Sequence, residues 1–208
     1  MGTRDYSALG SEITLILGGA RSGKSTFAEK LAMDTHAAVT YLAAADAQDS
    51  EMQARIEMHK KRRPAGWKTF EGDPYEICQA TKTIKGVLLL DCLTLWLTRL
   101  FLEGDAAEDA SEKEWQAREE QIRALTEDLC SLPPKGTHLI MVSNEVGFGL
   151  VPSYKMGRRF RDLQGRMNQL CASKADRAAL IVAGYPLWLK GGMEDHCWKR
   201  KKTDFRII

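Results

Sequence analysis

An eight-residue segment near the N-terminus has the pattern G-x-x-x-x-G-K-S. A short apolar run, Ile13–Leu17, precedes it and a helical pattern follows it; the segment reads Gly18-Gly19-Ala20-Arg21-Ser22-Gly23-Lys24-Ser25. Strand, glycine turn and helix in this order are typical of a phosphate loop. The glycines let backbone N–H groups approach an anion, and the N-terminus of the helix adds partial positive charge. The segment therefore predicts a site for a nucleoside triphosphate.

Three side chains have the chemistry that a bound triphosphate needs. We expect Lys24 to reach the β- and γ-phosphates as a catalytic residue, and the Ser25 hydroxyl to ligate Mg²⁺. Asp91 ends the apolar run Val87–Leu90, which is typical of a buried parallel strand. A carboxylate at this position can hold the same ion directly or through water, so Asp91 is predicted to complete the metal site with Ser25.

Strand and helix patterns alternate along most of the 208 residues. This alternation predicts an α/β fold, a single P-loop NTPase (RecA-like) domain with a mainly parallel sheet and helices on both faces. We expect a flexible N-terminal extension at 1–11, the P-loop domain at 12–190 and a basic C-terminal tail at 191–208. Sites in such sheets lie outside the carboxyl ends of the strands. The expected strand ends carry Gly18–Ser25, Ala43–Asp46, Asp91 and Ser143–Gly149.

The overall composition indicates a cytoplasmic protein. The net charge is +2, which provides no general electrostatic attraction to nucleic acid. The five cysteines form no C-x-x-C pair and are expected to be reduced thiols. No apolar run reaches transmembrane length, and the N-terminus lacks the apolar core of a signal peptide. We therefore expect no membrane insertion and no nucleic-acid partner.

A basic segment from Arg55 to Pro64 contains one histidine. On a helix, Arg55, His59 and Arg62 or Arg63 share a face, where guanidinium groups could bind phosphate oxygens. We expect the surrounding cations to lower the pKa of His59, and a neutral imidazole can attack phosphorus. From the spacing alone, a solvated basic helix with an incidental histidine is the more common case.

A second basic helix is expected at about 156–174. Its cationic face could contact phosphate, a partner subunit or acidic neighbours, and the spacing does not rank these three alternatives. No aromatic residues alternate with the basic ones, so it is a weak nucleic-acid surface.

Several motifs together carry a resemblance over about residues 12–190. In chain order they are the phosphate loop, Arg55-Ile-x-x-His59-x-x-x-Arg63-Pro64-x-x-Trp67, Leu90-Asp91-Cys-Leu-Thr94, Ser143-Asn-Glu-Val-Gly147-x-Gly149-x-Val151-Pro152 and Phe160-Arg-Asp-x-x-Gly165-Arg-x-Asn168-Gln169. This combination resembles the bifunctional adenosylcobinamide kinase/adenosylcobinamide-phosphate guanylyltransferase family of cobalamin biosynthesis. The phosphate loop alone is generic, whereas the histidine segment and the Asn-Glu-Val-Gly loop are specific.

The resemblance implies two reactions. The family phosphorylates the aminopropanol hydroxyl of adenosylcobinamide with ATP or GTP, then transfers GMP from GTP to that phosphate through a GMP–histidine intermediate. His59 matches the histidine, Arg63 is a candidate clamp for the α-phosphate, and Glu71 matches a nucleotide-binding acid. The family also implies a homotrimer, whose interface would be one use for the second basic helix.

The chain departs from the family pattern at two places. The nucleotide-binding segment Ala43-Ala44-Ala45 lacks a Thr or Ser that is common there, and Arg99 stands where an Asn is common. Neither departure removes a residue of the proposed chemistry, but both bear on nucleotide preference.

Two other functions are compatible with the phosphate loop. A single-activity small-molecule kinase would use His59 only as a phosphate contact. A RecA-like nucleic-acid-binding ATPase module would use the two basic helices, and it predicts salt-dependent binding to DNA or RNA.

Overall fold

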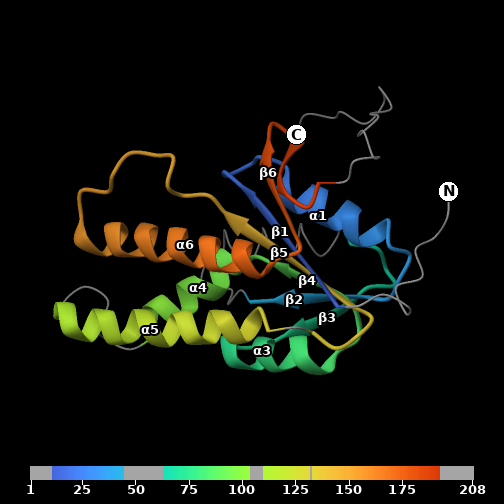
Figure 1. Ribbon diagram of the computed structural model, residues 1–208, viewed down its shortest axis with the longest axis horizontal. Helices are drawn as coiled ribbons and strands as arrows, with labels where there is room; N and C mark the ends of the chain where they lie inside the picture. The colour runs from blue at the N-terminus through green and yellow to red at the C-terminus, as the bar shows by residue number, and fades with distance from the viewer. Residues whose placement is uncertain (1–10, 45–62, 104–109, 132, 193–208) are drawn as a thin grey trace.

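A twisted, mainly parallel sheet with helices on both faces forms the body of the protein (Figure 1). The computed structural model describes residues 11–44, 63–103, 110–131 and 133–192. Its strands are β1 (Glu12–Gly18), β2 (Val39–Ala43), β3 (Lys68–Glu71), β4 (Gly86–Asp91), β5 (Thr137–Asn144), β6 (Arg177–Val182) and β7 (Tyr185–Lys190). Its helices are α1 (Lys24–Met33), α3 (Pro74–Thr83), α4 (Leu93–Leu102), α5 (Glu112–Leu129) and α6 (Lys155–Lys174).

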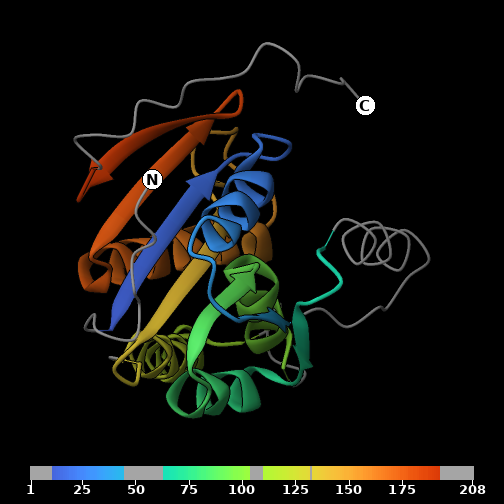
Figure 2. The same ribbon diagram turned by 90° about the vertical axis from the view of Figure 1, so that its right-hand side faces the viewer.

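The strand order is β3-β2-β4-β5-β1-β6-β7, and among these described strands only β7 runs antiparallel to its neighbour. Strand β5 separates β1, which leads into the phosphate loop, from β4, which carries Asp91. Figure 2 shows β5 between β1 and β4. The fold class predicted from the alternation of strands and helices is confirmed.

Two apolar clusters attach the helices to the sheet. One joins α3, α4, α5 and α6 to one face of the sheet, and its largest fully buried side chain is that of Trp96. The other joins α1 to the opposite face through Phe27, Ala28 and Ala32. Strand residues therefore alternate between the two clusters, as the pleat of a sheet covered on both sides requires.

Local sequence signals account for several helix boundaries. Helix α3 begins after Asp73, whose carboxylate accepts hydrogen bonds from the N–H groups of Tyr75 and Glu76, and Pro74 occupies its first turn. Helix α5 begins with a similar capping box between Ser111 and Glu114. Helix α5 ends at Leu129, three residues before the end that the two prolines suggested.

A buried histidine on β5 gives folding a pH dependence. His138 is 1% exposed, and its Nε2 lies 2.8 Å from Thr14 Oγ1. Burial and, to a smaller extent, the charge of Arg177 lower the pKa of His138 from 6.5 to about 3. Between these two values the folded protein keeps the imidazole neutral, whereas the unfolded chain binds a proton.

We therefore expect His138 to contribute stability that is complete above about pH 6.5 and lost as the pH falls towards 3. His138 contributes at most about 1.4 kcal/mol per pH unit to the slope of the free energy of unfolding against pH. Urea unfolding at pH 7.5 and 5 measures the effect, which His138→Gln should reduce and His36→Asn, at an exposed position, should not. An unchanged slope in His138→Gln would show that other groups cause the pH dependence.

Candidate active site

The phosphate loop connects β1 to α1 through a compact turn. Arg21 and Gly23 both have positive φ, 56° and 93°, and the Ser22 N–H donates to the Gly19 carbonyl at 3.3 Å. Helix α1 starts at Lys24, and its N-cap residue Gly23 has no side chain to cap it, in contrast to the capping boxes of α3 and α5. The first N–H groups of α1 therefore remain available to an anion.

Close packing under the loop requires glycine at its first position. A Cβ on Gly18 would collide with the Ser22 hydroxyl and lie 2.9 Å from the Ile181 carbonyl oxygen. The turn between β6 and β7 supports the loop from the same side, because the Gly184 N–H donates to the Ser22 carbonyl at 2.8 Å. The loop conformation thus depends on a hairpin about 160 residues further along the chain.

The structure brings Lys24, Ser25 and Asp91 together. The Ser25 hydroxyl donates to Asp91 Oδ1 at 3.2 Å, across 66 residues of sequence. The Lys24 ammonium donates to the Gly19 carbonyl at 3.1 Å and so lies over the loop. Burial lowers the pKa of Lys24 below its ordinary value, while the nearby Cys92 and Asp91 side chains act in the opposite direction.

Arg63 lies at the same edge of the sheet. Its guanidinium carbon is 3.3 Å from the centre of the Tyr41 ring, and the Tyr41 hydroxyl donates to the Asp91 backbone carbonyl at 2.9 Å. Burial, and next the charge of Asp91, raise the pKa of Tyr41, so its hydroxyl keeps the proton that it donates. A continuous line of contacts thus leads from Arg63 to the predicted metal-binding acid.

Other predicted residues are more distant or lie outside the described residues. Glu71 is exposed at the end of β3, four strands from β1, and the structure does not bring it against the phosphate loop. Ala43 ends β2, and Ala44 is buried just beyond it. Ala45 and His59, with the helix predicted from about Ser50, lie outside the described residues.

Arg99, one of the departures from the family pattern, has a structural role. Its guanidinium donates to the Gly72 carbonyl at 2.9 Å and to the Ala44 carbonyl at 3.4 Å. These carbonyls lie just beyond the carboxyl ends of β3 and β2. Arg99 therefore fixes the backbone next to Glu71 and to the alanine segment.

Sequence reasoning missed a buried polar network beside the loop. Gln164 and Asn168 on α6 hydrogen-bond to the Ser143 hydroxyl at 3.0 and 2.7 Å, and Asn168 also donates to the Asn144 carbonyl at 3.1 Å. The Thr94 hydroxyl accepts from the Asn144 N–H at 2.9 Å. Most of these residues belong to the motifs quoted above, but spacing alone did not indicate that they touch.

The arginines of the second basic helix have partners within the chain. Arg159 is buried, donates to the Ala110 carbonyl at 3.0 Å and lies over the Trp115 ring. Arg166 pairs with Glu119 on α5, and Arg158 donates to two carbonyls of the preceding loop. Of the three alternatives left open by the sequence, the structure supports contact with acidic neighbours, and it adds contacts with backbone carbonyls.

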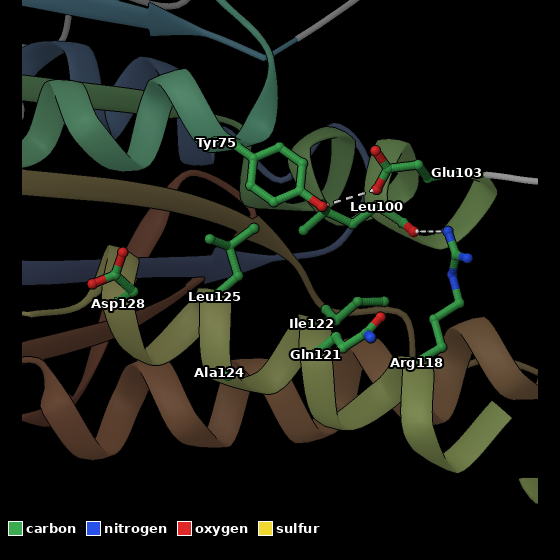
Figure 3. Close-up of a pocket in the computed structure, with 9 residues that line it drawn as sticks. All are labelled: Tyr75, Leu100, Glu103, Arg118, Gln121, Ile122, Ala124, Leu125 and Asp128. Atoms are coloured by element: carbon green, nitrogen blue, oxygen red, sulfur yellow. Dashed lines mark hydrogen bonds between the residues drawn. The ribbon is translucent and has the colours of Figure 1, made fainter. Parts of the chain in front are cut away.

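The groove drawn in Figure 3 lies apart from these residues, between α3, α4 and α5. Its volume is about 560 Å³. Within it, the Tyr75 hydroxyl donates to the Glu103 carboxylate at 3.2 Å. Arg118 donates to the Leu100 carbonyl at 2.8 Å. None of the described residues that are predicted to bind nucleotide lines it. The prediction of a triphosphate site therefore rests on the chemistry of its residues.

A family model described as cobinamide kinase / cobinamide phosphate guanyltransferase matches residues 14–189. The chain belongs to this family. It is 44% identical over 180 residues to the bifunctional adenosylcobalamin biosynthesis protein CobP of Pseudomonas aeruginosa, covering 85% of this chain and 96% of that protein. It is 39% identical to the corresponding CobU protein of Escherichia coli, covering 85% and 98%.

A solved protein from Pyrococcus horikoshii superposes with a TM-score of 0.50 over 93% of this chain and 94% of its own. At 8% identity, this likeness shows the fold alone. In the described part of the chain, no helix is both long and apolar enough to cross a membrane.

Proposed function

We propose that this member of the family phosphorylates adenosylcobinamide with ATP or GTP, and then transfers GMP from GTP to the new phosphate. The products of the second reaction are adenosylcobinamide-GDP and pyrophosphate. The observation that carries the proposal is the contact between Ser25 and Asp91 beside Lys24, in a chain whose sequence matches the family over residues 14–189.

In the first reaction the substrate hydroxyl attacks the γ-phosphorus and releases its proton to solvent. The bond from that phosphorus to the β–γ bridging oxygen breaks, and the nucleoside diphosphate leaves. The loop N–H groups and the Lys24 ammonium hold the β- and γ-phosphate oxygens, where charge changes most during transfer. Lys24 would exchange its bond to the Gly19 carbonyl for bonds to phosphate.

The residues at the loop also fit Mg²⁺. This ion prefers oxygen ligands, and the Ser25 hydroxyl and the Asp91 carboxylate are two oxygen donors in contact with each other. Bound there, Mg²⁺ would neutralise charge on the β- and γ-phosphate oxygens.

In the second reaction a ring nitrogen of His59 attacks the α-phosphorus of GTP, and the α–β bridging bond breaks to release pyrophosphate. A phosphate oxygen of the corrinoid substrate then attacks the same phosphorus, the P–N bond breaks, and His59 is regenerated. His59 stands four positions before Arg63, and four residues of chain span at most about 14 Å. The contact of Arg63 with Tyr41 supports an action of this segment near Asp91. Arg63 is the proposed residue that holds the α-phosphate. Glu71 is the proposed carboxylate that accepts hydrogen bonds from the N–H groups of guanine.

The test supplies the purified protein with adenosylcobinamide, MgCl₂ and GTP and identifies the products by mass spectrometry. We expect adenosylcobinamide-phosphate, adenosylcobinamide-GDP and a protein form heavier by one GMP when the corrinoid is left out. A product set with only the phosphate and no GMP–protein would instead support the single-activity kinase.

We also propose that the chain assembles as a homotrimer, as the family resemblance implies. Large apolar side chains are exposed in the loop after β5, where Phe148 and Leu150 are 83% and 97% exposed, and on edge strand β7. Light scattering should give three times the chain mass of 23.3 kDa, and a monomer mass would contradict the proposal.

A further inference from the structure

The carboxyl end of β5 lies between the two parts of the triphosphate site. Asn144, its last residue, is paired in register with Gly18 at the start of the phosphate loop. On the other side of β5, Asp91 of β4 is paired with Val142, two residues before Asn144. Because neighbouring strands are about 4.8 Å apart, the end of β5 is the backbone segment between the loop and Asp91.

The alternation of side chains along β5 places Asn144 on the face of the sheet that α1 covers. Ile140 and Val142 belong to the apolar cluster with Phe27 of α1, whereas Ser143 contacts Gln164 on α6, on the opposite face. Successive side chains of a strand point to opposite faces, so Asn144 shares the α1 face with Ile140 and Val142. Asp91 is on this face too, since it accepts the hydrogen bond from Ser25 of α1.

Hydrogen bonds hold the backbone of Asn144 on both sides, while its side chain makes no hydrogen bond to the described residues. Its N–H donates to Thr94 and its carbonyl accepts from Asn168, which is 5% exposed. The next N–H, that of Glu145, donates to the Gly18 carbonyl at 3.0 Å. Within the described part of the chain, the hydrogen bonds of Asn144 all go through its backbone. A buried polar network thus fixes the position of a residue whose amide remains available to a ligand.

We propose that Asn144 is a catalytic residue of the kinase reaction, and that its Nδ2 group donates a hydrogen bond to a non-bridging oxygen of the transferred γ-phosphoryl group. This inference rests on the proposed function. When the substrate oxygen bonds to the γ-phosphorus and the bond to the β–γ bridging oxygen breaks, charge is spread over the equatorial oxygens of that group. A fixed donor there lowers the barrier. In the guanylyl reaction the bond that breaks is at the α-phosphorus, so the same donor contributes little.

The test compares two activities of one variant. Asn144→Ala keeps the backbone bonds and removes only the amide, so we expect an unchanged melting temperature. The kcat of adenosylcobinamide phosphorylation should fall about 100-fold. The rate at which GTP attaches GMP to the protein should stay within about threefold of wild type. Gln116→Ala, at an exposed position on α5, is the matched control and should change neither rate.

Two outcomes would overturn the role of Asn144 while leaving the proposed function intact. One is an Asn144→Ala variant that loses both activities to the same extent; the other is a variant that loses neither. Failure of the proposed function is seen separately, in a wild-type protein that neither phosphorylates adenosylcobinamide nor takes up GMP.

Discussion

Replacing Lys24 by alanine should reduce both the phosphorylation of adenosylcobinamide and the attachment of GMP to the protein, each by about 10³-fold. Lys24 is the cation that lies over the phosphate loop, 3.1 Å from the Gly19 carbonyl. In the kinase reaction it would stabilise charge on the γ-phosphoryl group, and in the guanylyl reaction charge on the departing pyrophosphate. If both reactions use one triphosphate site, both rates should fall together. The two initial rates are measured on the same preparation.

The control is Lys30→Ala in the last turn of the same helix. Lys30 pairs with Asp34 at the surface, so its removal takes away a lysine of α1 without touching the loop. We expect both rates to remain close to wild type in this variant. Retention of GMP attachment in Lys24→Ala would contradict a shared site and would require a second place for GTP.

Replacing His59 by alanine should abolish GMP attachment while the kinase rate stays within about threefold of wild type. The imidazole is the proposed nucleophile at the α-phosphorus, and alanine offers no atom that can form the P–N bond. The γ-phosphoryl transfer uses the substrate hydroxyl and needs no such bond. Intact mass after incubation with GTP measures the first activity, and formation of adenosylcobinamide-phosphate measures the second.

The matched histidine control is His36→Asn, because His36 is exposed after α1 and has a φ of 55°, which asparagine tolerates. It should be labelled with GMP as wild type is. Label that persists in His59→Ala would assign the nucleophile to another residue. A wild-type protein without acid-labile label would exclude the covalent route.

Local structure was largely predictable wherever the signal lies within a few residues. The bounds of α3 were predicted correctly because Asp73 and Pro74 define a helix start by their own chemistry. The start of α1 was predicted correctly because the glycines of the loop separate the strand before it from the helix after it. Helix α5 ended earlier than predicted, because the prolines that follow set only an outer limit to it.

Contacts between distant residues were predictable only where a known motif connects them. A phosphate loop needs an acid at the end of a nearby strand, and from this rule we predicted that Asp91 completes the metal site with Ser25. The structure brings the two side chains into contact. No comparable rule indicated that Tyr41 would join Arg63 to Asp91, because these three lie on separate segments. The roles proposed for Glu71 and His59 remain predictions.

The sequence by itself determined the fold class and the family, and it predicted the triphosphate site, because these depend on residue type and short-range order. Only the tertiary structure decided which strand separates β1 from β4, and therefore that Asn144 stands between Gly18 and Asp91. Strand order follows from how helices cover the two faces of a sheet, a property of the whole chain that no local pattern contains. This order places Asn144 between the phosphate loop and Asp91, where we propose that it contacts the γ-phosphate.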